Sequence, residues 1–69
     1  MKLLFSERLR DLRIEKDMKQ IQLAEKLHTT QRKVSYWETG KTEPDLASLW
    51  EIAELFGVSV DYLIGKIDY

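Results

Sequence analysis

The sequence of 69 residues contains no cysteine, one proline, one histidine and three glycines. Without cysteine the chain can form neither a disulfide nor a thiolate metal site, and the lone His28 has no partner for a metal or catalytic role. With few glycines and prolines, little of the chain is expected to form turns. Leucine, isoleucine, glutamate, lysine and arginine are abundant, and these residues favour helices. A chain of this length buries only about 60% of the surface that its unfolded state exposes. It can therefore form no more than one small core. We therefore expect one compact all-α domain over residues 1–69, with no bound metal.

Long hydrophobic runs and catalytic motifs are missing as well. No uncharged stretch is long enough to span a bilayer, and no charged segment precedes an apolar one at the N-terminus. These absences predict a cytoplasmic protein without membrane contact. The sequence also has no glycine-rich phosphate loop, no serine with a base beside it, and no paired carboxylates with a plausible cleft. We therefore expect no enzymatic activity and no cofactor.

The formal net charge is −1, but the charges are unevenly distributed. Residues 1–41 hold ten Lys or Arg and six Asp or Glu, whereas residues 42–69 hold one Lys and six Asp or Glu. The two halves thus carry +4 and −5. This division predicts a molecule with one basic and one acidic face, although a chance division of a short chain would look the same.

Apolar residues recur with helical spacing in five segments. The expected helices cover residues 5–16, about 20–27, about 31–38, about 46–56 and about 60–65. Thr30, Asp45 and Ser59 are suitable N-caps, and Gly40 and Gly57 suit helix ends. The core stripe expected on the fourth segment is Leu46, Leu49, Trp50, Ala53 and Phe56. For Trp50 the core is the favoured location and a partner surface the alternative. Short connections between the segments predict a compact five-helix bundle.

The third segment is unusual because its outer face is polar without being acidic. Gln31, Arg32, Ser35 and Tyr36 share that face, while Val34 and Trp37 point the opposite way. Glutamine can pair with adenine and arginine with guanine, and an aromatic ring can contact the thymine methyl group. The pattern by itself fits either a solvated helix face or a helix that reads base edges in the major groove.

Residues across most of the chain resemble a known family. The matching residues are Gln20 to Leu27, Thr29 to Gln31, Val34, Trp37, Glu38, Gly40 to Thr42, Pro44 to Leu46, Leu49, Ile52, Ala53, Phe56 to Ser59 and Asp61 to Leu63. In order and spacing they are similar to the lambdoid phage repressor and Cro type of helix-turn-helix, which includes Xre-type bacterial regulators. The resemblance covers roughly residues 4–65. It implies a lambda-repressor-like DNA-binding domain whose helix-turn-helix motif spans about 20–38.

The resemblance also implies a role for each matching residue. The base-reading residues it implies are Gln31, Arg32 and Tyr36, with Lys33 and Ser35 beside them. The phosphate-contacting residues are Gln20, Lys41 and Thr42, with Lys19 as a further candidate. Gln20 would act together with the N-terminal amides of its helix, which favour an anion. Arg13 and Glu38 match a structural ion pair between the first and third helices; the alternative is two unrelated surface charges.

Three departures from the family pattern concern the turn and the charges near DNA. His28 stands where the family usually has glycine, so we predict a left-handed backbone there, at a cost of about 1 kcal/mol. Histidine is among the side chains that best tolerate a positive φ. Lys19 replaces a capping Ser or Thr, and Glu43 and Asp45 occupy positions where some relatives are basic. These charges predict weaker DNA binding than in basic relatives.

The function implied is a sequence-specific regulator of transcription that binds double-stranded DNA, most simply a repressor, with an activator as the alternative that the sequence does not separate from it. We expect a weak or DNA-induced homodimer on a palindromic operator, with recognition helices about 34 Å apart. The candidate dimer interface is Val58, Val60 and Tyr62, with Ile67 and Tyr69 as possible additions; these residues could equally close the core. The alternative function is a protein-interaction or antitoxin-type module in which DNA binding is secondary. Its surface, or that of a protein antagonist, would be the acidic half with Glu51, Glu54, Asp61 and Asp68.

Overall fold

A computed structural model describes residues 3–68 and shows the expected all-α architecture. The helices are α1 (Phe5–Glu15), α2 (Gln20–Lys26), α3 (Gln31–Thr39), α4 (Leu46–Phe56) and α5 (Val60–Ile64). Each boundary lies within one residue of the range expected from the sequence. No helix within the described residues is long and apolar enough to cross a membrane.

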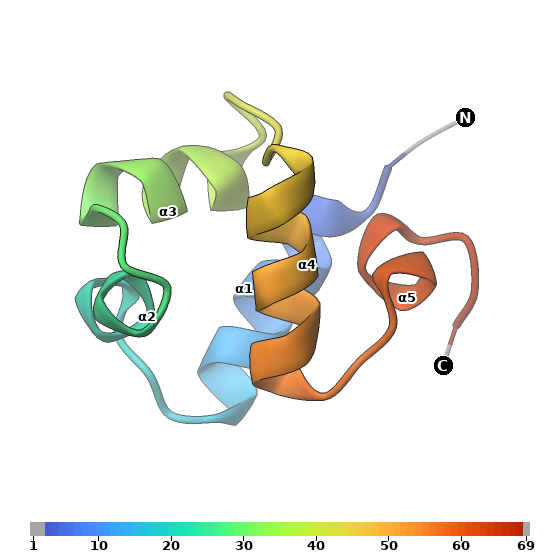
Figure 1. The fold of residues 1–69 in the computed structure, drawn as a ribbon, viewed down its shortest axis with the longest axis horizontal. Helices are drawn as coiled ribbons and strands as arrows, with labels where there is room; N and C mark the ends of the chain where they lie inside the picture. The colour runs from blue at the N-terminus through green and yellow to red at the C-terminus, as the bar shows by residue number, and fades with distance from the viewer. Residues whose placement is uncertain (1–2, 69) are drawn as a thin grey trace.

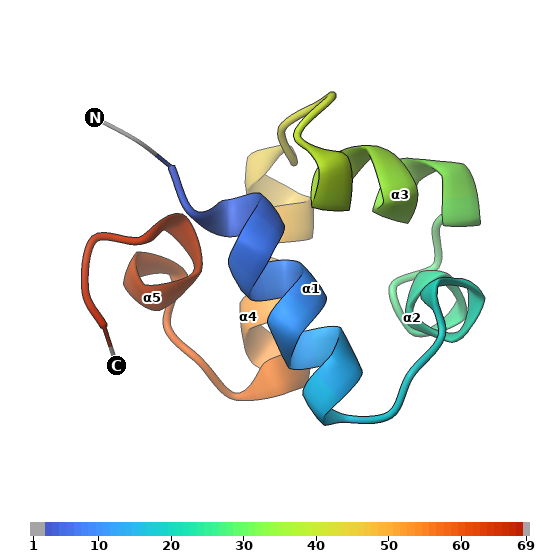
Figure 2. The ribbon, with the colours of Figure 1, turned by 180° about the vertical axis from the view of Figure 1, so that it is seen from behind.

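The helices surround a small central core (Figures 1 and 2). α1 and α4 lie in the middle of the molecule on opposite faces, with α2 and α3 to one side and α5 to the other. α3 packs against both α1 and α2, and α5 packs against α1 and α4. The helix-turn-helix pair α2–α3 is therefore held by α1, and the outer side of α3 stays open.

The core is apolar throughout the described residues. It comprises Phe5, Leu9, Leu12, Leu23, Ala24, Leu27, Val34, Trp37, Ile52, Ala53 and Leu63. Trp37 of α3 is its largest side chain and meets the ring of Phe5 edge to face, with ring centroids 6.5 Å apart. Each large side chain of this kind stabilises the fold by about 1.5–3 kcal/mol. Trp37 thus fixes α3 to α1 while the polar residues around it face outward.

Local sequence determines where the helices begin and end. The side chains of Thr30, Asp45 and Ser59 each accept a hydrogen bond from the backbone N–H three residues later, as N-caps do. α3 and α4 end at Gly40 and Gly57, both in the left-handed conformation. These five predicted helix signals are confirmed.

The turn between α2 and α3 carries the predicted strained residue. His28 has φ 56°, so the prediction of a left-handed histidine is confirmed. Asp17, in the connection between α1 and α2, has φ 55°, which no sequence signal predicted. Asp tolerates this conformation better than most residues because its short polar side chain can hydrogen-bond locally. Both connections around α2 therefore use a left-handed residue that is not glycine.

The expectation that Trp50 lies in the core is wrong. Its side chain is 60% exposed, and Leu46 is 85% exposed. At 3.6 residues per turn, the side of α4 that meets the core is centred on Leu49, Ile52 and Phe56, which are buried or half-buried. Leu46 and Trp50 lie one turn apart on a neighbouring face. The expected stripe was therefore too wide, and two of its five residues face solvent.

Candidate nucleic-acid interface

The outer face of α3 is polar and open. Gln31, Arg32 and Lys33 are exposed, and Ser35 and Tyr36 are half-buried. On the opposite face Val34 and Trp37 are buried in the core. The five residues expected to read bases therefore lie together on one helix whose orientation the core fixes.

Two positively charged side chains, Arg32 and Lys41, lie near the ring of Tyr36 on this face. The guanidinium carbon of Arg32 lies 6.0 Å from the centre of the Tyr36 ring, and the Lys41 Nζ lies 5.1 Å from it. Both distances are within the reach of a cation–π interaction. The backbone N–H of Lys41 also donates to the Tyr36 carbonyl over 2.9 Å. The structure thus joins Arg32 and Tyr36, expected to read bases, to Lys41, expected to contact phosphate.

An ion pair holds α3 to α1 from the inside. The Arg13 Nε lies 2.7 Å from the Glu38 Oε2, and the Arg13 Nη2 donates to Oε1 over 3.0 Å. The two side chains are only 14% and 3% exposed. The Glu38 carboxylate raises the pKa of Arg13, chiefly through this hydrogen bond. Arg13 therefore keeps its charge, and its guanidinium lies against the Glu38 carboxylate beneath the interface.

The same ion pair also orders the start of α2. Arg13 Nη1 donates to the carbonyl of Met18 over 2.8 Å, and the Gln20 Nε2 donates to Glu38 Oε1 over 3.2 Å. A carboxamide nitrogen has two N–H donors, so Gln20 keeps one for another acceptor. The arrangement links α1, the first residue of α2, and α3 in one hydrogen-bonded unit.

The remaining residues expected to contact phosphate lie at the edges of this face. Lys19 is the exposed N-cap residue of α2, and its backbone N–H donates to the Gln22 Oε1 over 2.8 Å. A lysine side chain has no acceptor, so Lys19 cannot make the reciprocal capping bond. Thr42 is exposed in the loop after α3. Among the described residues, no group of three His, Asp or Glu side chains is placed to hold a metal ion.

The residues expected at a dimer interface lie on the opposite side from α2 and α3. Val58, Val60 and Tyr62 are half-buried and pack against the core. Ile67 is also half-buried, and Tyr69 lies outside the described residues. Val58, Val60 and Tyr62 therefore each cover the core with part of the side chain and leave another part exposed.

Arg8 is a structural residue that no sequence motif indicated. Its guanidinium lies 4.3 Å from the centre of the Tyr62 ring and donates to the carbonyls of Tyr62 and Ile67. It also forms an ion pair with Asp68 over 3.2 Å. These contacts join α1 to the end of the chain across more than fifty residues, and no local pattern signals them. They place Arg8 beneath the candidate dimer surface rather than on the DNA-facing side.

Comparisons with known proteins agree with this geometry. Residues 9–63 match the model of a helix-turn-helix family. Over 60 residues the chain is 42% identical to the HTH-type transcriptional activator BcrR of Enterococcus faecalis, covering 87% of this chain but 29% of that protein. The chain thus spans less than a third of that relative's length.

Two solved structures have the same fold. A transcriptional regulator from Listeria innocua superposes with a TM-score of 0.91 at 36% identity, covering 97% of this chain and 63% of that one. The P22 c2 repressor, crystallised with a synthetic operator, superposes with a TM-score of 0.84 at 28% identity, covering 93% of this chain and 96% of that one. From the family match and these likenesses, the chain belongs to the helix-turn-helix family of the Xre, Cro and phage-repressor type.

Proposed function

We propose that this chain is a sequence-specific DNA-binding domain that regulates transcription, with α3 in the major groove. The observation that carries the proposal is the exposed polar face of α3, anchored by Trp37 and continued by the Arg32, Tyr36 and Lys41 cluster. The proteins similar to it are named as transcriptional regulators, and one was crystallised with its operator. Phosphate contacts position such a domain, and base contacts give it specificity.

The phosphate contacts are assigned to both edges of α3. Lys41 and Thr42 hold the backbone beyond the C-terminal end of the helix. On the other side, Lys19 and the free N–H of the Gln20 carboxamide hold a second phosphate. Because the other Gln20 N–H is bonded to Glu38, the ion pair that fixes α3 also orients this contact.

The base contacts are assigned to the face between these two edges. Gln31 and Arg32 are exposed near the start of α3, where side chains reach base edges. Glutamine reads adenine and arginine reads guanine through paired hydrogen bonds. Tyr36 presents its ring to a thymine methyl group. Lys33 and Ser35 flank these residues and contact bases or phosphates beside them.

One domain covers too little DNA for genomic specificity, so we extend the proposal to a homodimer on a palindromic operator. The partly exposed surfaces of Val58, Val60 and Tyr62 form the symmetric contact. Their half-buried state fits a weak interface that DNA binding completes. Half-sites about one helical turn apart, or roughly 34 Å, would then be occupied together. Repression follows when such a dimer covers a promoter.

Selection of bound sites from random double-stranded DNA tests this function directly. We expect a palindromic consensus of two half-sites, each about four base pairs, whose spacing gives the dimer geometry. Binding of the selected site should fall linearly with salt on logarithmic axes, because phosphate contacts release counterions. Equal weak binding to every sequence at each salt concentration would contradict the proposal.

A protein-interaction module of antitoxin type is the second candidate, and one observation favours it. The acidic C-terminal half exposes large hydrophobic side chains on α4 that the core does not need. A domain that only bound DNA through α3 would gain nothing from that exposure. If site selection fails, a protein partner on α4 becomes the primary function.

A further inference from the structure

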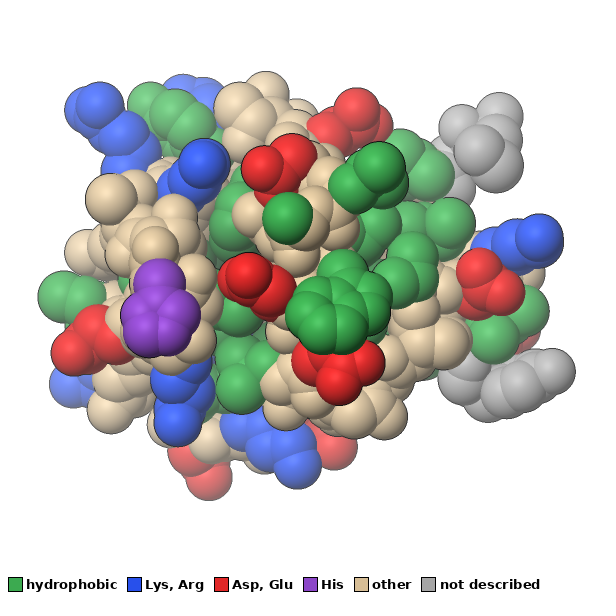
Figure 3. All heavy atoms as spheres, viewed as in Figure 1, with side chains coloured by type: hydrophobic (Ala, Val, Ile, Leu, Met, Phe, Trp, Pro, Cys, Tyr) green, Lys and Arg blue, Asp and Glu red, His purple; other side chains and the backbone are tan. Residues whose placement is uncertain are grey.

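The outer face of α4 exposes two large hydrophobic side chains side by side. Leu46 is 85% exposed and Trp50, one turn later, is 60% exposed. Figure 3 shows hydrophobic side chains at the surface over α4, with Asp and Glu side chains around them. Hydrophobic surface of this kind, rimmed by polar groups, marks an interaction site in soluble proteins.

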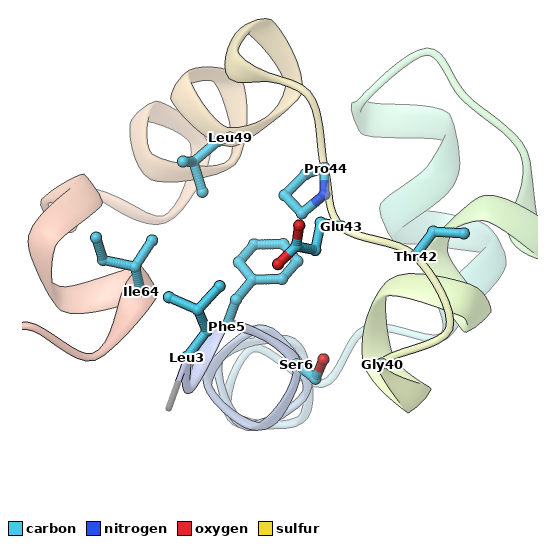
Figure 4. Close-up of a pocket in the computed structure, with 9 residues that line it drawn as sticks. All are labelled: Leu3, Phe5, Ser6, Gly40, Thr42, Glu43, Pro44, Leu49 and Ile64. Carbon is cyan, nitrogen blue, oxygen red and sulfur yellow. The ribbon is translucent and has the colours of Figure 1, made fainter. Parts of the chain in front are cut away.

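A pocket of about 330 Å³ adjoins this face (Figure 4). Its walls come from the start of α1, the α3–α4 loop, α4 and α5. The lining residues are Leu3, Phe5, Ser6, Gly40, Thr42, Glu43, Pro44, Leu49 and Ile64. Leu49 lies three residues after Leu46 on α4, so the two are neighbours on the helix surface. The pocket and the exposed α4 face therefore form one continuous surface, which we call the α4 groove.

The segment that forms α4 and its flanking connections carries charged side chains of one sign. No Lys or Arg occurs between Thr42 and Gly65, a stretch that contains five carboxylates. Glu51 and Glu54 follow Trp50 on α4, and the Glu43 side chain points into the pocket in Figure 4. Within residues 3–68, none of these three glutamates takes part in an ion pair. Their potential therefore acts on whatever approaches the groove.

This charge decides between the possible occupants. A symmetric contact between two copies would place Glu51 and Glu54 close to their own counterparts, and like charges across an interface cost several kcal/mol. DNA phosphates would be repelled as well. An occupant with both apolar side chains and positive charge meets no such opposition.

We propose that the α4 groove is the docking site for a basic amphipathic segment of another protein. One apolar side chain of that segment fills the pocket against Phe5 and Leu49. A second covers Trp50, and Lys or Arg side chains lie opposite Glu43, Glu51 and Glu54. An amphipathic helix laid in a groove presents its anchors with this spacing.

Docking in the groove is coupled to the α3–α4 loop. Gly40, Thr42 and Glu43 line the pocket, and Lys41, between them, contacts the Tyr36 ring. A bound segment therefore restrains the loop that carries two of the proposed phosphate contacts, and changes DNA affinity. This coupling rests on the proposed function, whereas docking itself does not.

Two helical peptides of about 14 residues serve as probes, one built from leucine and lysine and the other from leucine and glutamate. Trp37 is buried and Trp50 is exposed, so acrylamide quenching of fluorescence reports mainly on Trp50. We expect the lysine peptide to protect Trp50 from quenching and the glutamate peptide to leave it accessible. Equal effects of the two peptides, or no protection by either, would overturn the proposal.

Variants then locate the contact by anisotropy of a dye-labelled lysine peptide. Trp50→Ala should weaken binding about thirtyfold, as loss of an aromatic anchor does. Ile21→Ala is the matched control, since Ile21 is 53% exposed on α2, away from the groove. Glu51→Lys should weaken binding, and Glu15→Lys on α1 should not. Circular dichroism checks that each variant is folded.

Three results would contradict specific parts of the proposal. If Ile21→Ala weakened the peptide as much as Trp50→Ala, binding would be non-specific and the groove assignment wrong. If Trp50→Ala instead abolished self-association of the free protein, the groove would be a contact between copies. If the lysine peptide bound the groove without changing affinity for the selected DNA site, docking would stand and its coupling to DNA would be refuted.

Discussion

α3 and α4 are helices of similar size with opposite surfaces. α3 buries its apolar residues Val34 and Trp37 and exposes polar and basic ones. α4 buries Ile52 and Ala53 but also exposes Leu46 and Trp50, among carboxylates. A helix needs only one apolar stripe to join a core. α3 therefore has one apolar face toward the core and one polar face for binding, whereas α4 exposes more apolar surface than folding requires.

The difference extends to how each helix is held. α3 is tied to α1 and α2 by core packing, by the Arg13–Glu38 ion pair and by Gln20. α4 depends on its caps at Asp45 and Gly57 and on packing along one side. A face that reads bases must be held in a fixed orientation, whereas a docking groove needs only accessible surface. Five experiments test this difference between the two helices.

The two tryptophans should differ most in stability. Trp37→Ala is expected to cost about 3–5 kcal/mol in the free energy of unfolding, because it leaves a large cavity in the core. For a domain this small, that loss approaches its whole stability. Trp50→Ala should change the free energy of unfolding by less than about 0.5 kcal/mol, since Trp50 is exposed. Urea unfolding followed by circular dichroism measures both; similar losses would mean that Trp50 is packed in solution.

Breaking the ion pair should have the next largest effect. Glu38→Ala leaves the Arg13 guanidinium largely buried without its partner, and we expect a loss of about 2–3 kcal/mol in the free energy of unfolding. The double variant Arg13→Met with Glu38→Leu removes both charges and should lose much less. A double variant as unstable as Glu38→Ala would show that packing, and not the unpaired charge, causes the loss.

Substitutions at a base contact and at a phosphate contact should have different effects on DNA binding. Gln31→Ala should cost about 1–3 kcal/mol of binding free energy and relax preference at one position of the site. Lys41→Ala should weaken all sequences alike and reduce the salt slope by about one. Titration of the selected site and of single-base variants distinguishes them. If both substitutions behaved alike, the assignment of Gln31 to base reading would be wrong.

A substitution in the turn before α3 should have a smaller effect, and should raise the free energy of unfolding or leave it unchanged instead of lowering it. His28 is left-handed, and glycine adopts that conformation without steric cost. His28→Gly should therefore be neutral, or should raise the free energy of unfolding by up to about 1 kcal/mol. Thermal unfolding checks this, with Lys26→Gly as a control that places glycine in a helical residue and should destabilise. A clear loss of stability in His28→Gly would mean that the imidazole makes a stabilising contact.

The smallest expected effect is on stability, at the N-cap of α4, and it depends on pH. Hydrogen bonds from Ser48 to the Asp45 carboxylate lower the pKa of Asp45 below its ordinary value. A group whose pKa is lower in the folded state stabilises the fold above its unfolded pKa, and that contribution is lost as pH falls through the folded value. The gap in urea midpoint between the native sequence and Asp45→Ala should be present at about pH 7 and narrow at about pH 2.5. An unchanged gap would show that the cap acts without its charge.

Local signals predicted most of the fold. Capping side chains, left-handed glycines and helical periodicity act over a few residues, so Thr30, Asp45 and Gly57 placed helix ends correctly. The left-handed His28 was predicted from the family resemblance, which puts glycine at this position, and from the tolerance of histidine for positive φ. Asp17 was missed because the family resemblance pointed to the second connection and not to the first.

The chemistry of the α3 face was likewise determined by the sequence alone, since a helix of known phase puts Gln31, Arg32 and Tyr36 on one side of its axis. Which side chains of α4 face the core and which face solvent follows from packing between helices. Whether Trp50 is core or surface depends on which side of α4 packs against the core, and the spacing of apolar residues on α4 does not by itself fix that side. The link from Arg8 to Tyr62 and the pocket beside Leu49 likewise join residues far apart in the sequence. Contacts of that kind arise from packing between elements, which no local pattern specifies.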